Sequence, residues 1–393
     1  MMRVPISVAI GSFAAWLISG ACAFAQDRAS AAVKIGLVVP KTGGFNAIGR
    51  QVVAGARLYV QTHGDTVAGR KIALIVRDDT SAPDVAKRIA QELIVNDQVQ
   101  IIGGGITPTA LTIAPLATQA KTAMVVIVSG ASVVTERSPY VVRTSFTLGQ
   151  SSAVIADWAA KNGSRKVVTL VSDWAPGVEA ETAFRDRLLA GGGQIIEQLR
   201  VPLANPDFSP FLQRARDAAP DSLFVAVPGQ QAAVFAKQFA ERGLDKSGIR
   251  LIGPGDITDD DELNTMGDAV LGIVTAHNYA AAHPSPQNRD YVAAFRQANG
   301  FRPNFISVGG YDGMHLIYEA LKRTSGATDG DALVAAMKGM AWESPRGPIA
   351  IDAQTRDIVQ NIYIRKVERR DGELHNIEFA TYQAVKDPMK AGK

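Results

Sequence analysis

The chain has 393 residues, with 41 Lys or Arg against 38 Asp or Glu, so its formal net charge is +3. This near balance argues against a nucleic-acid-binding protein, which needs a clear excess of basic residues. Hydrophobic residues make up 47% of the chain, enough to form the cores of two ordinary domains.

Residues 1–25 have the features of a secretory signal peptide. Arg3 precedes a long uncharged stretch that ends on Ala23-Phe24-Ala25, a small-residue pattern typical of a cleavage site. The apolar core of this stretch is shorter than the ~20 residues that a membrane-spanning helix needs. We therefore predict that the mature protein begins near Gln26, outside the cytoplasm. A lipid attached to Cys22 is the alternative interpretation, although the leucine expected three residues before it is missing.

From residue 33 onward, apolar runs typical of buried strands alternate with turns and with amphipathic segments typical of helices. The predicted strands are residues 33–39, 72–76, 100–102, 123–128, 167–171, 195–201, 223–227 and 250–252. Most of them precede a helix, and the clearest helical signals cover residues 48–60, residues 81–95 and the segment that starts at Thr107. Strands that alternate with helices form parallel sheets covered on both faces.

Two of these helices have recognisable start signals. Ser81-Ala82-Pro83-Asp84 has the pattern of a capping box. Thr107-Pro108 combines an N-cap hydroxyl with proline at the first helical position. We expect both hydroxyls to cap their helices.

The alternation ends near Gln150 and resumes at Lys166, which predicts two sheets and therefore two lobes. After about Tyr279 the pattern changes to two helices and then to short antiparallel strands. The helices are expected over residues 291–299 and 305–324, and the strands over residues 349–351 and 361–367. The sequence thus indicates a two-lobed α/β protein.

Motifs of common enzyme classes are incomplete. Gly44-x-x-x-x-Gly49 is followed by Arg50 rather than Lys, which excludes a P-loop, and Pro108 stands where a dinucleotide fingerprint needs its third glycine. There is no G-x-S-x-G motif, and signal cleavage would remove the only cysteine, so neither thiol catalysis nor a disulfide is available. The five histidines lack metal-ligand spacing. We expect no enzymatic activity, no metal and no cofactor.

Two groups of acidic residues are open to a structural interpretation. The run from Asp259 to Glu262 lacks the spacing of a calcium loop, and we interpret it as complementing the dipole at a helix start. Asp78-Asp79 follows a strand and is interpreted as structural, or at most as a contact between lobes.

Three loops at the carboxyl ends of the first lobe's strands are candidates for a ligand site, because open α/β sheets bind ligands at that edge. They are residues 41–48, 106–109 and 129–132. All three are rich in small residues and hydroxyls, which let backbone N–H groups at helix N-termini approach an anion closely. A carboxylate would fit this arrangement.

Several short segments, in this order and spacing, resemble the periplasmic solute-binding proteins of ABC importers, specifically the branched-chain amino acid type. These segments are Val33-Lys34-Ile35-Gly36-Leu37, Thr42-Gly43, Ile101 to Thr109, Ser129-Gly130-Ala131-Ser132, Tyr140-Val141-Val142-Arg143-Thr144 and Gly310-Tyr311-Asp312. The resemblance implies the type I periplasmic binding protein fold, in which each lobe is a parallel sheet flanked by helices and three hinge strands join the lobes. It also implies a ligand held in the cleft, delivery to an inner-membrane ABC permease, location in the periplasm and a monomeric state.

In this resemblance, residues 33–148 and 279–340 form the first lobe, and residues 149–278 and 341–390 form the second. Thr107 corresponds to the hydroxyl that grips the ligand carboxylate, the loop at Ala131 and Ser132 contributes backbone, and Phe45 places a ring over the ligand. The full set of expected ligand-binding residues is Phe45, Thr107, Pro108, Thr109, Ser129, Gly130, Ala131, Ser132, Trp174, Gly229, Gln230, Gly255, Asp256 and Tyr311.

The second lobe departs from the family pattern. Pro176 replaces a tyrosine, with Trp174 nearby, and Gly255 stands where the family has the acid that pairs the ligand's ammonium. A buried ammonium without a counter-charge is costly. We therefore predict a small carboxylate ligand without an amine, of the benzoate or phenylpropenoate type, whose ring would lie against Phe45, Trp174 and Tyr311.

Alternatives remain at this point. Asp256, one residue later, could supply the missing counter-charge, which would make the ligand a hydrophobic or branched-chain amino acid. A sensor of amides or urea with the same fold and an exported hydrolase are the others.

Overall fold

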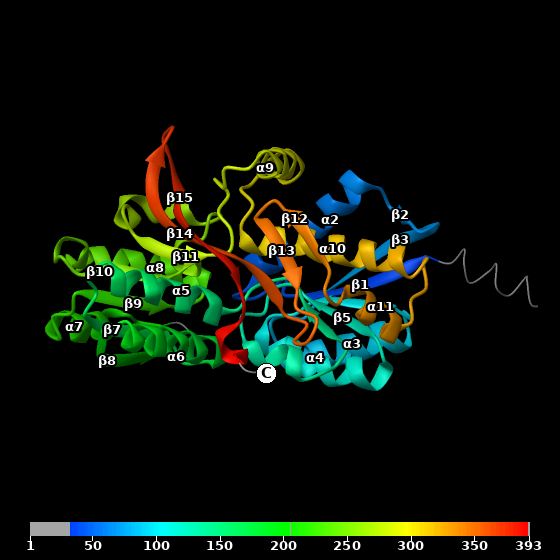
Figure 1. Ribbon diagram of the computed structural model, residues 1–393, viewed down its shortest axis with the longest axis horizontal. Helices are drawn as coiled ribbons and strands as arrows, with labels where there is room; N and C mark the ends of the chain where they lie inside the picture. Colours follow the sequence, from blue (N-terminus) through cyan, green and yellow to red (C-terminus); the bar gives the residue numbers. More distant parts are fainter. Residues whose placement is uncertain (1–31, 205, 392–393) are drawn as a thin grey trace, which may run out of the picture.

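The structure is a computed structural model that describes residues 32–204 and 206–391 (Figure 1). The predicted signal peptide therefore lies outside the described residues. Two sheets, each with helices packed beside it, form two lobes that lie end to end along the long axis of the molecule. In the part of the chain that the structure describes, no helix combines the length and the apolar character needed to cross a membrane.

The first lobe contains a six-stranded sheet in the order β2-β3-β1-β4-β5-β6. The strands are β1 (Val33–Val39), β2 (Thr66–Val67), β3 (Arg70–Asp78), β4 (Ile101–Gly104), β5 (Ala123–Val126) and β6 (Val141–Arg143). All pairs are parallel except β2 with β3. The helices of this lobe are α2 (Asn46–His63), α3 (Pro83–Val95), α4 (Thr107–Ala120), α9 (Pro286–Asn299), α10 (Phe305–Arg323) and α11 (Gly330–Met337).

The second sheet has nine strands in the order β12-β13-β14-β11-β10-β9-β7-β8, with β15 paired to β14. Its parallel part is β7 (Lys166–Ser172), β8 (Gln194–Val201), β9 (Ser222–Ala226), β10 (Arg250–Pro254) and β11 (Val274–His277). The antiparallel strands are β12 (Ala341–Ser344), β13 (Gly347–Ile351), β14 (Ile358–Arg370) and β15 (Glu373–Val385). The accompanying helices are α5 (Leu148–Lys161), α6 (Ala175–Ala190), α7 (Ser209–Asp217) and α8 (Gly229–Glu241).

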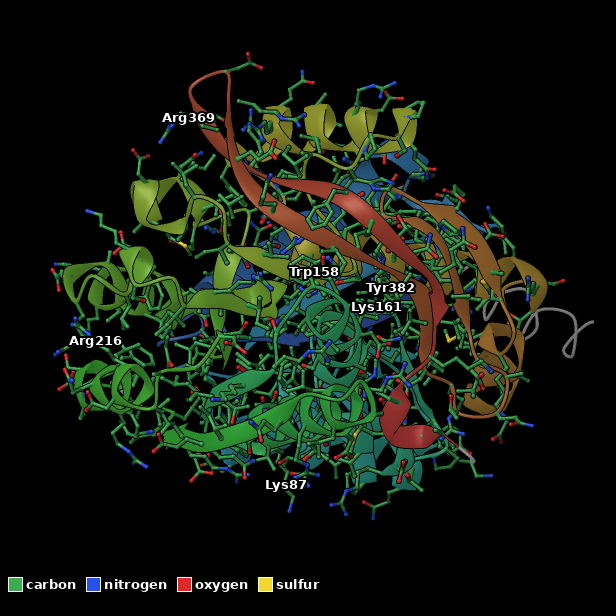
Figure 2. The ribbon with its side chains drawn as sticks, turned by 60° about the vertical axis from the view of Figure 1, so that its left-hand side comes forward. Lys87, Trp158, Lys161, Arg216, Arg369 and Tyr382 are labelled. Carbon is green, nitrogen blue, oxygen red and sulfur yellow. The ribbon has the colours of Figure 1, made fainter. Side chains whose placement is uncertain are left out.

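The predicted two-lobed α/β fold is confirmed, and so are the antiparallel strands expected near the C-terminus. Both sheets are mixed rather than purely parallel, because β2 and the C-terminal strands β12 to β15 add antiparallel pairs at their edges. Strand β15 lies over α5, where the ammonium of Lys161 sits 5.9 Å from the ring centre of Tyr382 and Trp158 contacts Phe379 edge-on (Figure 2). The C-terminal hairpin thereby covers one face of the second lobe.

The chain passes between the lobes at three places: between β6 and α5, between β11 and α9, and along β12 to β14. The buried side chain of Arg346 links two of these connections by hydrogen bonds. Arg346 donates to the carboxylate of Asp312 at 2.8 Å and to the backbone carbonyls of Thr144 and Ser145 in the first connection. The residues at which each lobe begins and ends stay a prediction.

Three local expectations were wrong. Ala82, not Ser81, is the N-cap of α3, and the Ser81 hydroxyl has no hydrogen-bond partner among the described residues. Ile106 is the N-cap of α4, so Thr107 occupies the first helical position and its hydroxyl does not cap the helix. The acidic run does not open an α-helix but lies between two 3₁₀ segments, η3 (Gly255–Thr258) and η4 (Leu263–Val270).

Candidate functional site

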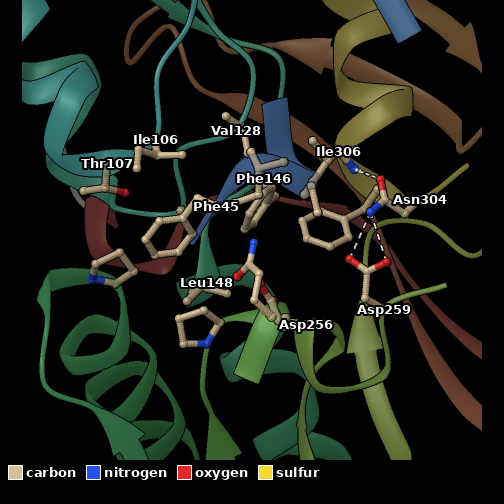
Figure 3. Close-up of a pocket in the computed structure, with 18 of the residues that line it drawn as sticks. Phe45, Ile106, Thr107, Val128, Phe146, Leu148, Asp256, Asp259, Asn304 and Ile306 are labelled. Carbon is tan, nitrogen blue, oxygen red and sulfur yellow. Dashed lines mark hydrogen bonds between the residues drawn. The ribbon is translucent and has the colours of Figure 1, made fainter. Parts of the chain in front are cut away.

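A pocket with an empty volume of about 740 Å³, part of it open to solvent, lies between the two lobes (Figure 3). The first lobe, including the start of α10, contributes Phe45, Ala47, Ile48, Ile106, Thr107, Val128, Gly130, Phe146, Asn304, Phe305 and Ile306. Leu148, at the start of α5, and residues of the second lobe close the other side. The second-lobe residues are Trp174, Pro176, Pro228, Gly229, Gln230, Asp256, Asp259, Asp261 and Glu262.

Six helices begin at this pocket, because each supplies lining residues from its first turn. They are α2, α4, α5, α6, α8 and α10. The N-terminus of a helix carries partial positive charge and unpaired N–H groups, which favour an anion. None of the described lining residues has a basic side chain. The helix N-termini nevertheless make the site suited to a negatively charged ligand group.

The loop that carries Phe45 is held by Asp78 at the end of β3. The carboxylate of Asp78 accepts hydrogen bonds from the backbone of Lys41 at 2.8 Å and from the hydroxyl of Thr42 at 2.7 Å. These bonds lower the pKa of Asp78 even though its burial acts in the opposite direction. The structural interpretation of this acid agrees with these contacts.

Thr107 lines the pocket, and its hydroxyl lies 2.8 Å from that of Ser129. Both side chains are buried, and either oxygen can be the donor in this pair. When Ser129 donates, Thr107 retains its own hydrogen for a ligand. The pair thus provides a polar point on a first-lobe wall whose described lining residues carry no charged side chain.

Aromatic rings form two groups around the pocket. Phe45 and Trp174 face one another across the lobes, with ring centres 6.5 Å apart and planes inclined by 22°. Phe146 meets Phe305 edge to face at 5.0 Å. Flat apolar ligands gain both burial and ring contacts in such surroundings.

Tyr311, which was expected to contact the ligand, does not line this pocket. It lies farther along α10, where its ring packs edge-on against Tyr59 at 4.9 Å and Tyr291 at 5.1 Å. Phe146 and Phe305, which were not predicted, line the pocket instead.

The second-lobe wall is acidic. Asp259 accepts two hydrogen bonds of 3.0 Å from the amide nitrogen of Asn304, drawn as dashed lines in Figure 3, and burial raises its pKa to about 8. Asp261 pairs with Arg50 of α2 at 2.5 Å. Burial also raises the pKa of Asp256 to about 7. Three of the four acids of the run, Asp259, Asp261 and Glu262, therefore line the pocket, which corrects the interpretation of the run as a helix-dipole feature.

The structure brings seven of the predicted site residues to the pocket and leaves the others outside it. The seven are Phe45, Thr107, Gly130, Trp174, Gly229, Gln230 and Asp256. Besides Tyr311, the residues that do not line it are Pro108, Thr109, Ser129, Ala131, Ser132 and Gly255. The Thr109 hydroxyl donates to the carbonyl of Ile106, and the Ser132 backbone N–H donates to Glu179 at 2.7 Å.

Gly255 has a packing role. A β-carbon at this position would come within 2.1 Å of an Arg365 nitrogen and 2.5 Å of the His277 ring. The guanidinium of Arg365 also donates to the Gly255 carbonyl at 3.2 Å. An acidic side chain at position 255 would have to displace both neighbours.

Several lining residues were missed by sequence reasoning, among them Phe146, Asp259, Asn304 and Phe305. One available signal was the start of α10, where Asn304 and Ser307 form a capping box. Such a cap places the polar Asn304 side chain at the end of a helix, where it can also face a neighbouring segment.

Two lobes that enclose a ligand-sized pocket, with loops and helix starts from both lobes around it, define a substrate-binding protein. The chain matches the family described as periplasmic binding protein over residues 32–373, and it belongs to that family.

Known relatives and solved structures agree with this assignment. The chain is 40% identical to Leu/Ile/Val-binding protein homolog 6 of Brucella suis biovar 1 (strain 1330), over 97% of this chain and 98% of the relative. It is 64% identical to a solute-binding protein of an ABC transporter from Rhodopseudomonas palustris BisB5 solved with 3,4-dihydroxybenzoic acid, with a TM-score of 0.90 over 92% of this chain and 99% of that one. It is 39% identical to a solute-binding protein of an ABC transporter from R. palustris HaA2 solved with p-hydroxybenzoic acid, with a TM-score of 0.89 over 92% of this chain and 100% of that one.

Proposed function

We propose that this chain is the substrate-binding component of an ABC importer and that it captures an aromatic carboxylate of the benzoate or phenylpropenoate type in the pocket between its lobes. The carboxylate binds at the first lobe, against the Thr107 hydroxyl and the helix starts. The ring lies between Phe45 and Trp174. The protein binds this ligand without changing it chemically.

The distribution of charge and rings around the pocket carries this proposal. Among the described lining residues, those of the first lobe offer hydroxyl and backbone groups but no charge, and the rings of Phe45 and Trp174 face each other across the lobes. A branched-chain amino acid would bring an ammonium on the carbon next to its carboxylate. That ammonium would lie against the uncharged first-lobe wall, where its desolvation would be poorly compensated.

The two solved relatives bound to hydroxylated benzoates support the same ligand class. The name of the Brucella relative supports the alternative, a branched-chain amino acid, for which Asp256 would be the counter-charge.

A thermal-shift panel separates the two ligand classes. Benzoates and phenylpropenoates should raise the melting temperature, whereas leucine, isoleucine, valine, urea and simple amides should not. A shift with the amino acids alone would contradict the proposal, and breakdown of a bound ligand during incubation would indicate an exported hydrolase.

We further propose that the protein is exported to the periplasm by cleavage of residues 1–25, acts as a monomer and delivers its ligand to an inner-membrane ABC permease. Membership of the periplasmic binding protein family and the Ala23-Phe24-Ala25 pattern support this assignment. Intact-mass measurement of protein recovered from the periplasm should give a chain that begins near Gln26. Retention of residues 1–25, or a lipid on Cys22, would contradict it.

A further inference from the structure

The second-lobe wall of the pocket contains buried acceptor atoms that have no donor. One carboxylate oxygen of Asp256 (Oδ2) and the side-chain carbonyl oxygen of Gln230 (Oε1) are shielded from solvent and have no hydrogen-bond partner among the described residues. Both residues line the pocket. A buried acceptor without a donor is costly, so these two atoms indicate that a bound ligand supplies the donor.

Two other acids of this wall already have partners, and a third, Glu262, is only partly buried. Asp259 is bonded to Asn304 and Asp261 to Arg50. Asp256 forms no ion pair with Arg365, whose guanidinium donates to backbone and threonine oxygens and pairs with Asp260. Among the described residues of this wall, the buried acceptor atoms without a donor are therefore those of Asp256 and Gln230.

These acceptors lie on the wall opposite the carboxylate site. Figure 3 shows Thr107 on the first-lobe side of the pocket and Asp256 on the second-lobe side, with Phe45 between them. A ligand that reaches both must carry its carboxylate at one end and a hydrogen-bond donor at the other. A hydroxyl across the ring from a carboxylate meets this requirement, whereas the ammonium of an α-amino acid is adjacent to its carboxylate.

We propose that Asp256, assisted by Gln230, determines specificity for a ring hydroxyl, so that the ligand class is the hydroxylated aromatic acids rather than benzoates in general. This inference rests on the proposed function. The ring hydroxyl donates to the Asp256 carboxylate, and Gln230 offers a second acceptor for a neighbouring hydroxyl.

The readout is the ratio of dissociation constants for benzoate and 4-hydroxybenzoate, measured by calorimetry, with 4-methoxybenzoate as a ligand that keeps the oxygen but cannot donate. A hydrogen bond to a carboxylate should make this ratio about 10 to 100 in the native protein. 4-Methoxybenzoate should bind no better than benzoate. Asp256→Ala should bring the ratio close to one, and Asp256→Asn, which keeps an acceptor oxygen, should retain part of it.

A native ratio near one, or a ratio that Asp256→Ala leaves unchanged, would overturn the inference while leaving the proposed function intact. Failure of every benzoate to bind the native protein would overturn the proposed function itself. Tight binding of leucine that Asp256→Asn reduces more than a hundredfold would instead assign Asp256 as the counter-charge of an ammonium. Because each variant is compared across ligands, general loss of folding cannot produce a selective change in the ratio.

Discussion

Asn304 donates its amide nitrogen to both carboxylate oxygens of Asp259, at 3.0 Å each, and thereby joins the start of α10 to the segment that follows β10. The two residues come from different lobes and lie side by side at the same edge of the pocket (Figure 3). Arg50 and Asp261 form a second link across the same boundary, at 2.5 Å. These contacts bring the two lobes together beside the proposed ligand site.

The Asp259 carboxylate gives a stability prediction with a defined sign. Burial raises its pKa from 3.8 to about 8, so between those pH values the folded protein holds a proton that the unfolded chain releases. The contribution of the protonated Asp259 side chain to the free energy of unfolding is therefore full below about pH 4 and is lost as the pH rises toward 8. Asp259→Asn should therefore raise the melting temperature at pH 8.5 more than at pH 5. The new amide oxygen still accepts from Asn304, and an equal shift at both pH values would contradict the assignment.

Thr107 is predicted to donate its hydroxyl to the ligand carboxylate. Thr107→Ala removes a hydrogen bond to a charged group, worth about 1.5 to 3 kcal/mol, so affinity for benzoates should fall by about 10- to 100-fold. Thr107→Ser keeps the hydroxyl and should retain most of the affinity. Calorimetry measures both, and an unchanged affinity in the alanine variant would show that the carboxylate lies elsewhere.

Trp174 is predicted to stack on the ligand ring opposite Phe45. Trp174→Ala should weaken the binding of aromatic acids by roughly tenfold or more, because the variant loses both buried area and ring contacts. Trp174→Phe should lose much less. Tyr311→Leu is the matched control, since it removes a ring outside the pocket. The Tyr311→Leu variant should bind the ligand with native affinity, even if the loss of the ring contact with Tyr59 lowers its stability. A larger loss in Tyr311→Leu than in Trp174→Ala would reverse our assignment of the rings.

Local patterns predicted ten of the strands and most of the helices that follow them, because burial and helical periodicity are properties of contiguous segments. They did not predict the strands β2, β6, β11, β12 and β15. The predicted strand over residues 33–39 coincides with β1. The loops after β1, β4 and β5 were predicted to surround the ligand because the carboxyl ends of parallel strands share one edge of a sheet. Phe45, Thr107 and Gly130 lie in or next to these loops and do line the pocket.

The expectations for Tyr311, Asp259 and Gly255 differ from the structure for reasons that lie outside any local sequence pattern. Tyr311 follows Ile306 by five residues, which turns it by about 140° around the axis of α10, away from the pocket and toward α2. The bond between Asp259 and Asn304 joins segments 45 residues apart and depends on how the lobes meet, which no local pattern contains. Gly255 was interpreted through the acid it replaces, whereas its packing against Arg365 and His277 arises only in the folded protein.

The central claim, that the pocket binds an aromatic carboxylate rather than an aliphatic amino acid, is tested most directly by calorimetric titration. The protein should first be unfolded, dialysed and refolded to remove any ligand carried through purification, and then titrated with 4-hydroxybenzoate and with leucine. Our account predicts saturable one-to-one binding of 4-hydroxybenzoate and no measurable heat from leucine at the same concentrations. Tighter binding of leucine than of 4-hydroxybenzoate would contradict it.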